Sequence, residues 1–409
     1  MTDSRAERKR PSVLVLASTY PRWLGDPEPG FVHELAKRMV SDFNVAVLCP
    51  HAPGASGSQL MDGVRVVRYR YAPQRLETLV NDGGIVTNLR RQPWKWLLVP
   101  GFVLSLFWHT LKLTRQNKVS VIHAHWLIPQ GLIVALARMI LPKSVPQYVV
   151  TSHGADLFAL RGFGVRLLKK FVVRKAHSVT VVSESMRDEL MRVCAVTSEV
   201  LVRPMGVDLK HSFSPVPSAP RSQHEILFVG RLVEKKGLRD LIDALPTVLE
   251  QYPRARLTIA GFGPELHERK RQVEQLGISS NVKFIGAVTQ SDLPALYRRA
   301  ALFVAPFVQA RSGDREGLGL VMVEALGCGC PVVTTRTPSV REVFSGWPRF
   351  LAEPGSPSSL ATQIAMVFAD PAAARAWAAE ERVKVQTKFD YDGVAAAYVA
   401  LLKAGSEAA

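Results

Sequence analysis

The chain has 409 residues, of which 47% are hydrophobic and 21% are charged, and its formal net charge at pH 7 is +17. This composition excludes a disordered or collagen-like chain, and the length predicts two domains, because single cores rarely grow beyond about 250–300 residues. Residues 1–208 hold 28 Lys and Arg against 15 Asp and Glu, whereas residues 209–409 hold 24 against 20. The first half therefore has either an anionic partner (a phospholipid surface, a phosphorylated acceptor or nucleic acid) or a charge that simply favours solubility.

Short apolar segments and cysteines indicate the compartment. Residues 12–18 follow a basic tail but are too short for a signal peptide. The apolar run at residues 96–108 falls short of the about 20 residues that cross a bilayer, so we predict no transmembrane helix. The four cysteines form no CxxC pair, which indicates reduced thiols in a cytoplasmic protein.

Short β-branched runs alternate with helical patterns, such as the one at residues 31–40, along the whole chain. The first series of predicted strands covers residues 12–18, 43–50, 119–125, 147–154 and 177–185. The second series covers residues 225–231, 255–263, 281–287, 301–307 and 330–336. This alternation predicts an α/β fold with two Rossmann-like, doubly wound parallel sheets.

The Pro- and Ser-rich segment between the two series predicts a linker. We place an N-terminal domain at residues 1–211, the linker at 212–224, a C-terminal domain at 225–388, and a crossover helix and tail at 389–409. The helix at 392–405 is expected to return to the first domain. Residues 51–63 and 72–93 lack periodicity and are predicted to be mobile substrate loops.

A cluster of cations follows the first strand of the second series. Gly230 and Arg231 end that strand, and Lys235, Lys236 and Gly237 precede a helical pattern. Cations near a helix N-terminus repel its dipole unless an anion lies there, and a diphosphate would resolve the conflict. The alternative is a solvated charge cluster. Gly261 and Gly263 form a tight turn after the next strand, which either lets the backbone approach a ligand or is only loop geometry.

Two carboxylates lie eight residues apart in the segment DREGLGLVMVEALGCGCPVV. Glu316 is expected on a glycine-rich turn before a helix, and Glu324 about two turns inside it, so that both face one ligand. Glu316 could accept hydrogen bonds from sugar hydroxyls, and Glu324 from ribose hydroxyls. The alternatives are a helix-terminal charge and a buried, paired carboxylate.

Histidines lie at the carboxyl ends of two first-half strands. His123 and His125 alternate on one strand and point the same way, and His153, followed by Asp156, ends the next strand. His153 is either a ligand-facing or a structural histidine. A metal site is not predicted, because no third ligand, DxD or HExxH pattern accompanies the histidines.

Two other segments are candidates for a membrane interface. Residues 161–175 combine basic and apolar residues in helical sequence, as in helices that lie on anionic lipid, although the apolar stripe could equally face the sheet. Trp94, Trp96 and Trp108 bracket the apolar run and lie either at an interface or in the core.

Four segments of the second half, FVGRLVEKKG, AGFGPE, NVKFIG and EGLGLVMVEALGCGCPVV, resemble the donor domain of retaining family 4 glycosyltransferases, which have the GT-B fold. TYPRWLGDPEPGFVHELAKRM, HAHWLIPQG, TSHGADLF and RPMGVD are similar to that family's acceptor-domain signatures. The resemblance covers essentially the whole chain, and the second half is the more specific part. The first loop departs from the family, since residues 28–31 read EPGF where many relatives carry paired glycines.

The resemblance implies roles for individual residues. Arg231 and Lys236 would bind the donor diphosphate, Glu316 the transferring sugar and Glu324 the nucleotide ribose, and the catalytic residues would be Glu316, His153, Arg231 and Lys236. The donor site would also include the backbone of Gly230, Gly261, Gly263, Gly317, Leu318 and Gly319. The acceptor site would include Gly30, His125, His153 and Asp156, with Asp156 supporting the His153 loop.

The family's mechanism is front-face transfer with retention, in which the departing diphosphate helps take the acceptor proton and no enzyme nucleophile is needed. It implies no cofactor and no metal, since fixed positive charge stabilises the leaving group. We therefore expect a cytoplasmic, peripheral-membrane enzyme that moves a hexose from a UDP- or GDP-sugar to a lipid-linked or growing glycan in surface polysaccharide synthesis. The alternatives are a sugar-nucleotide epimerase of the same fold and a nucleic-acid-binding protein, for which no recognition motif is present.

Overall fold

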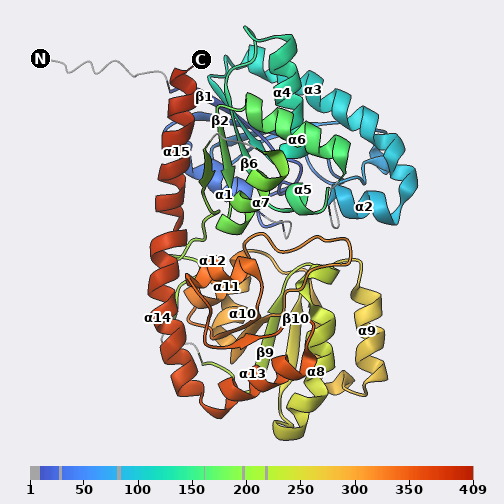
Figure 1. Cartoon of the computed structure of the whole chain (residues 1–409), viewed down its shortest axis with the longest axis vertical. Helices are drawn as coiled ribbons and strands as arrows, with labels where there is room; N and C mark the ends of the chain where they lie inside the picture. The colour runs from blue at the N-terminus through green and yellow to red at the C-terminus, as the bar shows by residue number, and fades with distance from the viewer. Residues whose placement is uncertain are drawn as a thin grey trace, which may run out of the picture.

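A computed structural model describes residues 10–26, 30–80, 84–160, 162–195, 199–216 and 220–408. The protein consists of two lobes, each with a β-sheet between helices, and two long C-terminal helices run along one side of both (Figure 1). The predicted fold class, two Rossmann-like domains with a helix returning to the first, is confirmed. The domain boundaries at residues 211, 224 and 388 stay predictions.

The first sheet has eight strands in the order β3-β4-β2-β1-β5-β6-β7-β8. Its central strands β1, β5 and β6 are almost wholly buried on both faces, as expected for parallel strands covered by helices on each side. The strands are β1 (Ser12–Leu16), β2 (Asn44–Pro50), β3 (Ser58–Met61), β4 (Val64–Tyr69), β5 (Val121–His125), β6 (Tyr148–Ser152), β7 (Ser178–Val181) and β8 (Val200–Val202).

Seven α-helices of the first domain connect these strands. They are α1 (Phe31–Arg38), α2 (Ile85–Arg91), α3 (Val99–Gln116), α4 (Leu132–Ile140), α5 (Ala155–Phe158), α6 (Phe163–Lys175) and α7 (Glu184–Cys194). Short turns η1 (Gln74–Leu76), η2 (Pro93–Leu98) and η3 (Leu127–Gly131) lie between them.

Both predicted loops of the first domain contain regular secondary structure, and their mobility stays a prediction. Residues 58–61 form β3, which pairs antiparallel with β4, so the sheet is mixed at this edge. Residues 72–93 contain η1 and α2, and their Glu77, Leu79 and Val80 are buried. Residues 81–83 lie outside the described residues.

The predicted length of the apolar run at residues 96–108 is also corrected. Together η2 and α3, Pro93–Gln116, are long and apolar enough to cross a membrane by length and composition, with a mean hydropathy of 1.4. In the structure α3 packs on β2, β4 and α4 through Phe102, Leu106 and Leu113. The helix α3 therefore covers one face of the first sheet. Only 33% of the most apolar 18-residue stretch of Pro93–Gln116 is buried.

The second sheet has six parallel strands in the order β11-β10-β9-β12-β13-β14. They are β9 (Glu225–Val229), β10 (Arg256–Ala260), β11 (Val282–Gly286), β12 (Leu302–Ala305), β13 (Val332–Thr335) and β14 (Leu351–Ala352). The covering helices are α8 (Leu238–Gln251), α9 (Leu266–Gln275), α10 (Leu293–Arg299), α11 (Leu320–Gly327), α12 (Pro338–Phe344) and α13 (Pro357–Ala369), with turns η4 (Glu234–Lys236) and η5 (Ser279–Asn281).

The chain returns to the first domain through α14 (Pro371–Phe389) and α15 (Tyr391–Glu407). Val394, Tyr398 and Leu402 recur every fourth residue and are buried, so α15 lays one stripe on α1, β5 and β6. The predicted linker is partly packed rather than loose, because Phe213 is buried and Arg298 donates to the carbonyl oxygens of Ser212 and Ser214. Residues 217–219 of the linker are not among the described residues.

Candidate active site

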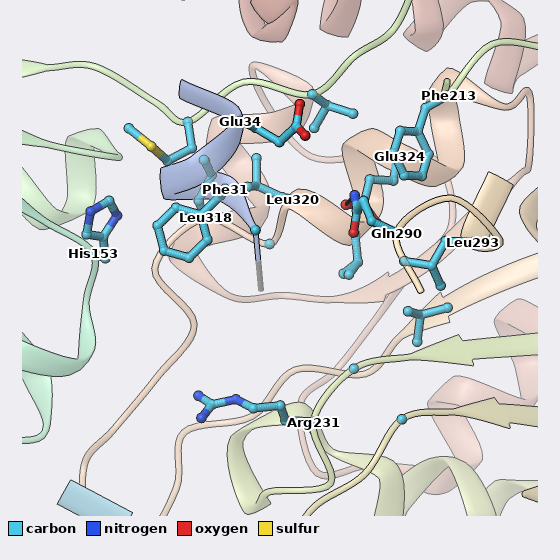
Figure 2. Close-up of a pocket in the computed structure, with 18 of the residues that line it drawn as sticks. Phe31, Glu34, His153, Phe213, Arg231, Gln290, Leu293, Leu318, Leu320 and Glu324 are labelled. Atoms are coloured by element: carbon cyan, nitrogen blue, oxygen red, sulfur yellow. Dashed lines mark hydrogen bonds between the residues drawn. The ribbon is translucent and has the colours of Figure 1, made fainter. Parts of the chain in front are cut away.

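A cavity of about 430 Å³ lies between the two domains, with walls from both. The strands point their carboxyl ends at it, and the loops after β6, β9, β10 and β11 supply much of its lining. This is the place where open parallel sheets bind ligands. Figure 2 shows Arg231 from the second domain and His153 from the first pointing into the same space.

The cationic side of the cavity comes from the loop after β9. Lys236 Nζ lies 2.7 Å from Glu316 Oε2, and Lys235 Nζ lies 3.3 Å from Asp314 Oδ2. Among the described residues, no carboxylate pairs with Arg231. The lysines therefore brace the loop before α11, while the Arg231 guanidinium remains available to an anion in the cavity.

The Lys236–Glu316 pair is nearly enclosed, with 13% and 16% of the two side chains exposed. Burial alone would raise the pKa of Glu316, but Lys236 and Lys235 lower it to about 2. Burial lowers the pKa of Lys236, and Glu316 opposes that shift. The carboxylate is therefore ionised throughout the neutral range.

The glycine pair after β10 serves mainly to pack two loops together. A Cβ at Gly261 would lie 1.9 Å from Gly230 O, and one at Gly263 would lie 2.6 Å from Leu232 O. Gly261 lines the cavity, but Gly263 does not. The donor role assigned to both glycines stays a prediction, and for Gly263 the packing supports the alternative of loop geometry.

Glu316 lies on a turn before α11, as predicted, and Gly319 is the N-cap of that helix in the left-handed conformation, with φ of +81°. Glu324 lies just over one turn inside α11 rather than two, because the helix begins only at Leu320. Glu324 is buried, and its carboxylate accepts hydrogen bonds from Gln290 Nε2 at 3.2 Å and Tyr297 Oη at 3.0 Å. Burial raises the pKa of Glu324 although these donors oppose it.

His153 follows β6 and lines the cavity beside two aromatic rings. Its ring centroid lies 5.0 Å from that of Phe31 and 5.1 Å from that of Trp126. Its Nε2 is 2.8 Å from Nδ1 of His125, which is wholly buried behind it. Burial lowers the pKa of His153 to about 3 and that of His125 well below its usual value, so both imidazoles are neutral near pH 7.

Asp156 supports the His153 loop and does not line the cavity. Its carboxylate accepts from the backbone N–H groups of Leu127 and His153 and from Ser152 Oγ, at 2.7, 3.3 and 2.9 Å. Asp156 supports the loop, as the resemblance implied. Neither His125 nor Asp156 lies on the cavity wall, and their assignment to the acceptor site stays a prediction. They fix the orientation of the residues that form that wall.

Gly317 lies where the two domains touch rather than on the cavity wall. A Cβ there would be 2.9 Å from the carbonyl oxygen of His153. Nearby, the Arg315 guanidinium lies 4.1 Å from the ring centroid of Phe158, which again joins the second domain to the first. The loop before α11 and the loop after β6 thus close one side of the cavity together.

Most of the predicted site residues meet at this cavity. Those on its wall are Gly30, His153, Gly230, Arg231, Lys236, Gly261, Glu316, Leu318, Gly319 and Glu324. The binding roles assigned to them stay predictions. The rest of the EPGF loop cannot be assessed, because residues 27–29 lie outside the described residues.

Sequence reasoning missed several residues of the site. Phe31, Glu34 and Lys37 of α1 line the cavity, and Lys37 Nζ lies 2.6 Å from Glu34 Oε1. Gln290 and Tyr297, which hold Glu324, were also missed. The helix that follows the loop of the first strand could have indicated the α1 residues. Within the described ranges, no three His, Cys, Asp or Glu are grouped to hold a metal ion.

Comparisons with known proteins identify this arrangement. The family model described as Glycosyl transferases group 1 matches residues 212–384, and the model described as Glycosyltransferase Family 4 matches residues 31–211. The two matches together run through most of the chain. The protein belongs to the family 4 glycosyltransferases and has the GT-B fold.

Individual relatives agree with this family. Glycogen synthase of Mycobacterium tuberculosis is 27% identical over 405 residues, covering 94% of this chain and 92% of its own. A GDP-mannose-dependent alpha-(1-6)-phosphatidylinositol monomannoside mannosyltransferase of Mycolicibacterium smegmatis is 28% identical over 280 residues, covering 65% of this chain and 71% of its own. Sucrose-phosphate synthase of Thermosynechococcus elongatus shares the fold, with a TM-score of 0.77 at 22% identity over 98% of this chain and all of that structure.

Proposed function

We propose that the protein is a retaining hexosyltransferase that moves a sugar from UDP or GDP to a lipid-linked or growing glycan acceptor. The observation that carries the proposal is the cavity in which Arg231 and the Lys236–Glu316 pair face His153 from the opposite domain. It provides fixed positive charge for a diphosphate on one side and a neutral, aromatic-flanked wall for a sugar on the other.

In the proposed reaction the bond between sugar C1 and the diphosphate oxygen breaks as the acceptor oxygen bonds to C1 on the same face. The acceptor proton passes to an oxygen of the departing diphosphate, so no enzyme nucleophile is required. Arg231 and Lys236 would stabilise the negative charge that develops on the leaving group. Glu316, ionised and held by Lys236, would accept hydrogen bonds from the sugar hydroxyls.

We propose that the reaction requires neither a cofactor nor a metal ion, because the side chains of Arg231 and Lys236 can supply the charge that a divalent ion would supply elsewhere. Turnover should be the same after treatment with EDTA as after treatment with added Mg²⁺. A loss of turnover with EDTA that Mg²⁺ restores would contradict this part of the proposal.

The acceptor and the compartment are proposed on two grounds. One is the basic first half of the chain, and the other is the names of the relatives, of which one is a glycogen synthase and another a phosphatidylinositol monomannoside mannosyltransferase. Both are compatible with a cytoplasmic enzyme at the membrane surface that takes part in surface polysaccharide synthesis. No role in nucleic-acid binding is proposed.

Screening of UDP- and GDP-sugars for donor hydrolysis and for transfer to lipid-extract acceptors tests the proposal. Wild-type protein should release UDP or GDP from one donor, and Glu316→Gln should not. A donor converted to its epimer without release of nucleotide would instead identify an epimerase. No consumption of any donor by folded protein would refute the proposal.

A further inference from the structure

The charge of the first domain is concentrated in one stretch of sequence. Residues 83–183 contain 14 Lys and Arg but only one acidic residue, Asp156, and that carboxylate is buried. Arg90, Lys112, Arg166 and Arg174 are among the exposed cations of this stretch. The formal net charge of residues 83–183 equals that of residues 1–208 as a whole. The other residues of the first half therefore contain as many acidic as basic side chains.

Large apolar side chains are exposed in the same stretch. Trp96 and Leu97 of η2 are 60% and 81% exposed, and Leu104 and Trp108 of α3 are 69% and 66% exposed. The end of α4 exposes Met139 and Ile140, and α6 exposes Phe163, Leu167 and Leu168. Exposed apolar side chains in such number indicate an interaction site rather than ordinary surface.

These elements lie on one face of the first sheet. The connections β4 to β5, β5 to β6 and β6 to β7 all run in the same direction across the sheet, and right-handed crossovers then place α3, α4 and α6 on the same side. In agreement, α3 packs on α4 and α4 packs on α6 (Figure 1). The two segments that the sequence offered separately as interface candidates therefore belong to one surface, which we call the α3–α4–α6 face.

We propose that the α3–α4–α6 face docks on an anionic phospholipid bilayer. Tryptophans favour the headgroup region, exposed Leu, Ile and Phe enter the acyl boundary, and surrounding Lys and Arg bind lipid phosphates. A second copy of the chain does not fit, because it would bring one strongly basic surface against another. Nucleic acid does not fit either, because it would leave the aliphatic side chains in water.

Docking of this face would also set the position of the active cavity relative to the bilayer. The α2 helix, which leads into η2 and α3, begins after Gly84, and a Cβ at Gly84 would lie 3.9 Å from an Arg231 guanidinium nitrogen. The segment that leads into the docked face therefore starts beside Arg231 of the cavity wall. The inference rests on the peripheral attachment proposed above, but it does not depend on the identity of donor or acceptor.

Flotation of the full-length protein with vesicles tests the face. Wild-type protein should float with phosphatidylcholine–phosphatidylglycerol vesicles and remain at the bottom with pure phosphatidylcholine. The triple variant Leu97→Ser, Leu104→Ser, Trp108→Ser should bind at least tenfold more weakly. The matched control, Leu276→Ser, Met366→Ser, Val383→Ser, removes exposed apolar groups of the second domain and should bind like wild type.

Charge reversal measures how much the basic side chains of the α3–α4–α6 face contribute to vesicle binding, apart from its apolar side chains. Lys112→Glu, Arg115→Glu, Arg166→Glu and Arg174→Glu together should abolish flotation, whereas the same change at exposed Arg254, Lys270, Arg271 and Arg375 should not. Circular dichroism and donor hydrolysis confirm that each variant is folded. If wild-type protein floats but both face variants float equally well, the assignment of the face is overturned while the proposed chemistry stands. If wild-type protein binds no vesicle, or forms dimers that the face variants break, membrane docking itself is overturned.

Discussion

Lys236 and Glu316 form a 2.7 Å ion pair that ties the turn after β9 to the loop before α11. The pair lies beside Arg231 at the cavity wall and is nearly enclosed. Each residue therefore has two tasks, since it faces the substrate cavity and also neutralises a buried charge of opposite sign. Variants that remove one partner have to be judged with this second task in mind.

Removing one partner should destabilise the protein more than removing both. Lys236→Met or Glu316→Gln leaves a buried group without its partner, and such losses cost about 3–5 kcal/mol. The double variant should lose less, because no charge remains unpaired. Donor turnover should fall at least about 100-fold in all three, as with other losses of transition-state charge stabilisation.

Urea unfolding and donor hydrolysis check this prediction. The control is Arg336→Met, which breaks an ion pair of 2.9 Å with Glu353 in which both side chains are exposed. It should cost less than about 1 kcal/mol and leave turnover unchanged. Additive effects of the two buried substitutions on the free energy of unfolding would show that the pair is not energetically coupled.

The buried histidines should make the first domain sensitive to acid. Burial lowers the pKa of His123 to about 3, from an unfolded value near 6.5, so the unfolded chain binds more protons between these values. The histidine contributes its full stability above pH 6.5 and loses it as the pH falls toward 3. The loss at pH 5 is about 2 kcal/mol for such a group.

Unfolding free energies at pH 7.5 and pH 5 measure this effect. In His123→Gln the drop between the two values should be smaller than in wild type by about that amount. Exposed His267→Gln is the control and should leave the drop unchanged. An identical drop in all three proteins would mean that other groups cause the acid sensitivity.

The motif residues could be predicted from the sequence because glycines and charges at strand ends have few other roles. The pairing of Lys236 with Glu316 could not be predicted, because it depends on how two loops that are 80 residues apart in the sequence come together in the fold. Glu77 shows the same difficulty. Its carboxylate is wholly buried, accepts a hydrogen bond from Arg70 Nε and lies 2.6 Å from His51 Nδ1. A polar residue therefore holds in place part of residues 72–93, which their composition had indicated to be a loop.

The antiparallel edge was missed for a related reason. Within β3 only Met61 is buried, so the strand shows no alternation of apolar and polar residues. Its formation depends on pairing with β4, which a local pattern does not contain. The position of His125 behind the wall was likewise hidden, because a residue behind the wall and one on it look the same in sequence.

Tyr297 should act on the donor through Glu324. Its hydroxyl donates to Glu324 Oε2 at 3.0 Å, and its ring packs against Phe213 and Phe303. Tyr297→Phe keeps this packing but frees one carboxylate oxygen to move. If Glu324 binds the nucleotide ribose, the variant should bind UDP or GDP about tenfold more weakly, as for one hydrogen bond to a charged group.

Titration calorimetry with UDP or GDP and with its 2′,3′-dideoxy form shows whether Tyr297 positions Glu324 for the ribose or only supports nucleotide binding in general. In wild-type protein the loss of both hydroxyls should reduce affinity strongly, and in Tyr297→Phe this discrimination should shrink. Equal weakening of both ligands would assign Tyr297 to packing alone. Phe303→Leu, which alters the packing around Tyr297 but not the hydrogen bond, is the control.

Gly317→Ala should impair turnover without unfolding either domain. The added Cβ would lie 2.9 Å from the backbone oxygen of His153, so the loop before α11 and the loop after β6 must separate. Because Glu316 and His153 are carried by these loops, their spacing across the cavity would change, and misplacement of about 1 Å can cost 100-fold in rate. We expect kcat/KM for transfer to fall at least about tenfold. Gly346→Ala, where a Cβ meets nothing within 4 Å, should behave like wild type in both kinetics and urea unfolding. Full activity of Gly317→Ala would show that the contact between the loops is not needed for catalysis.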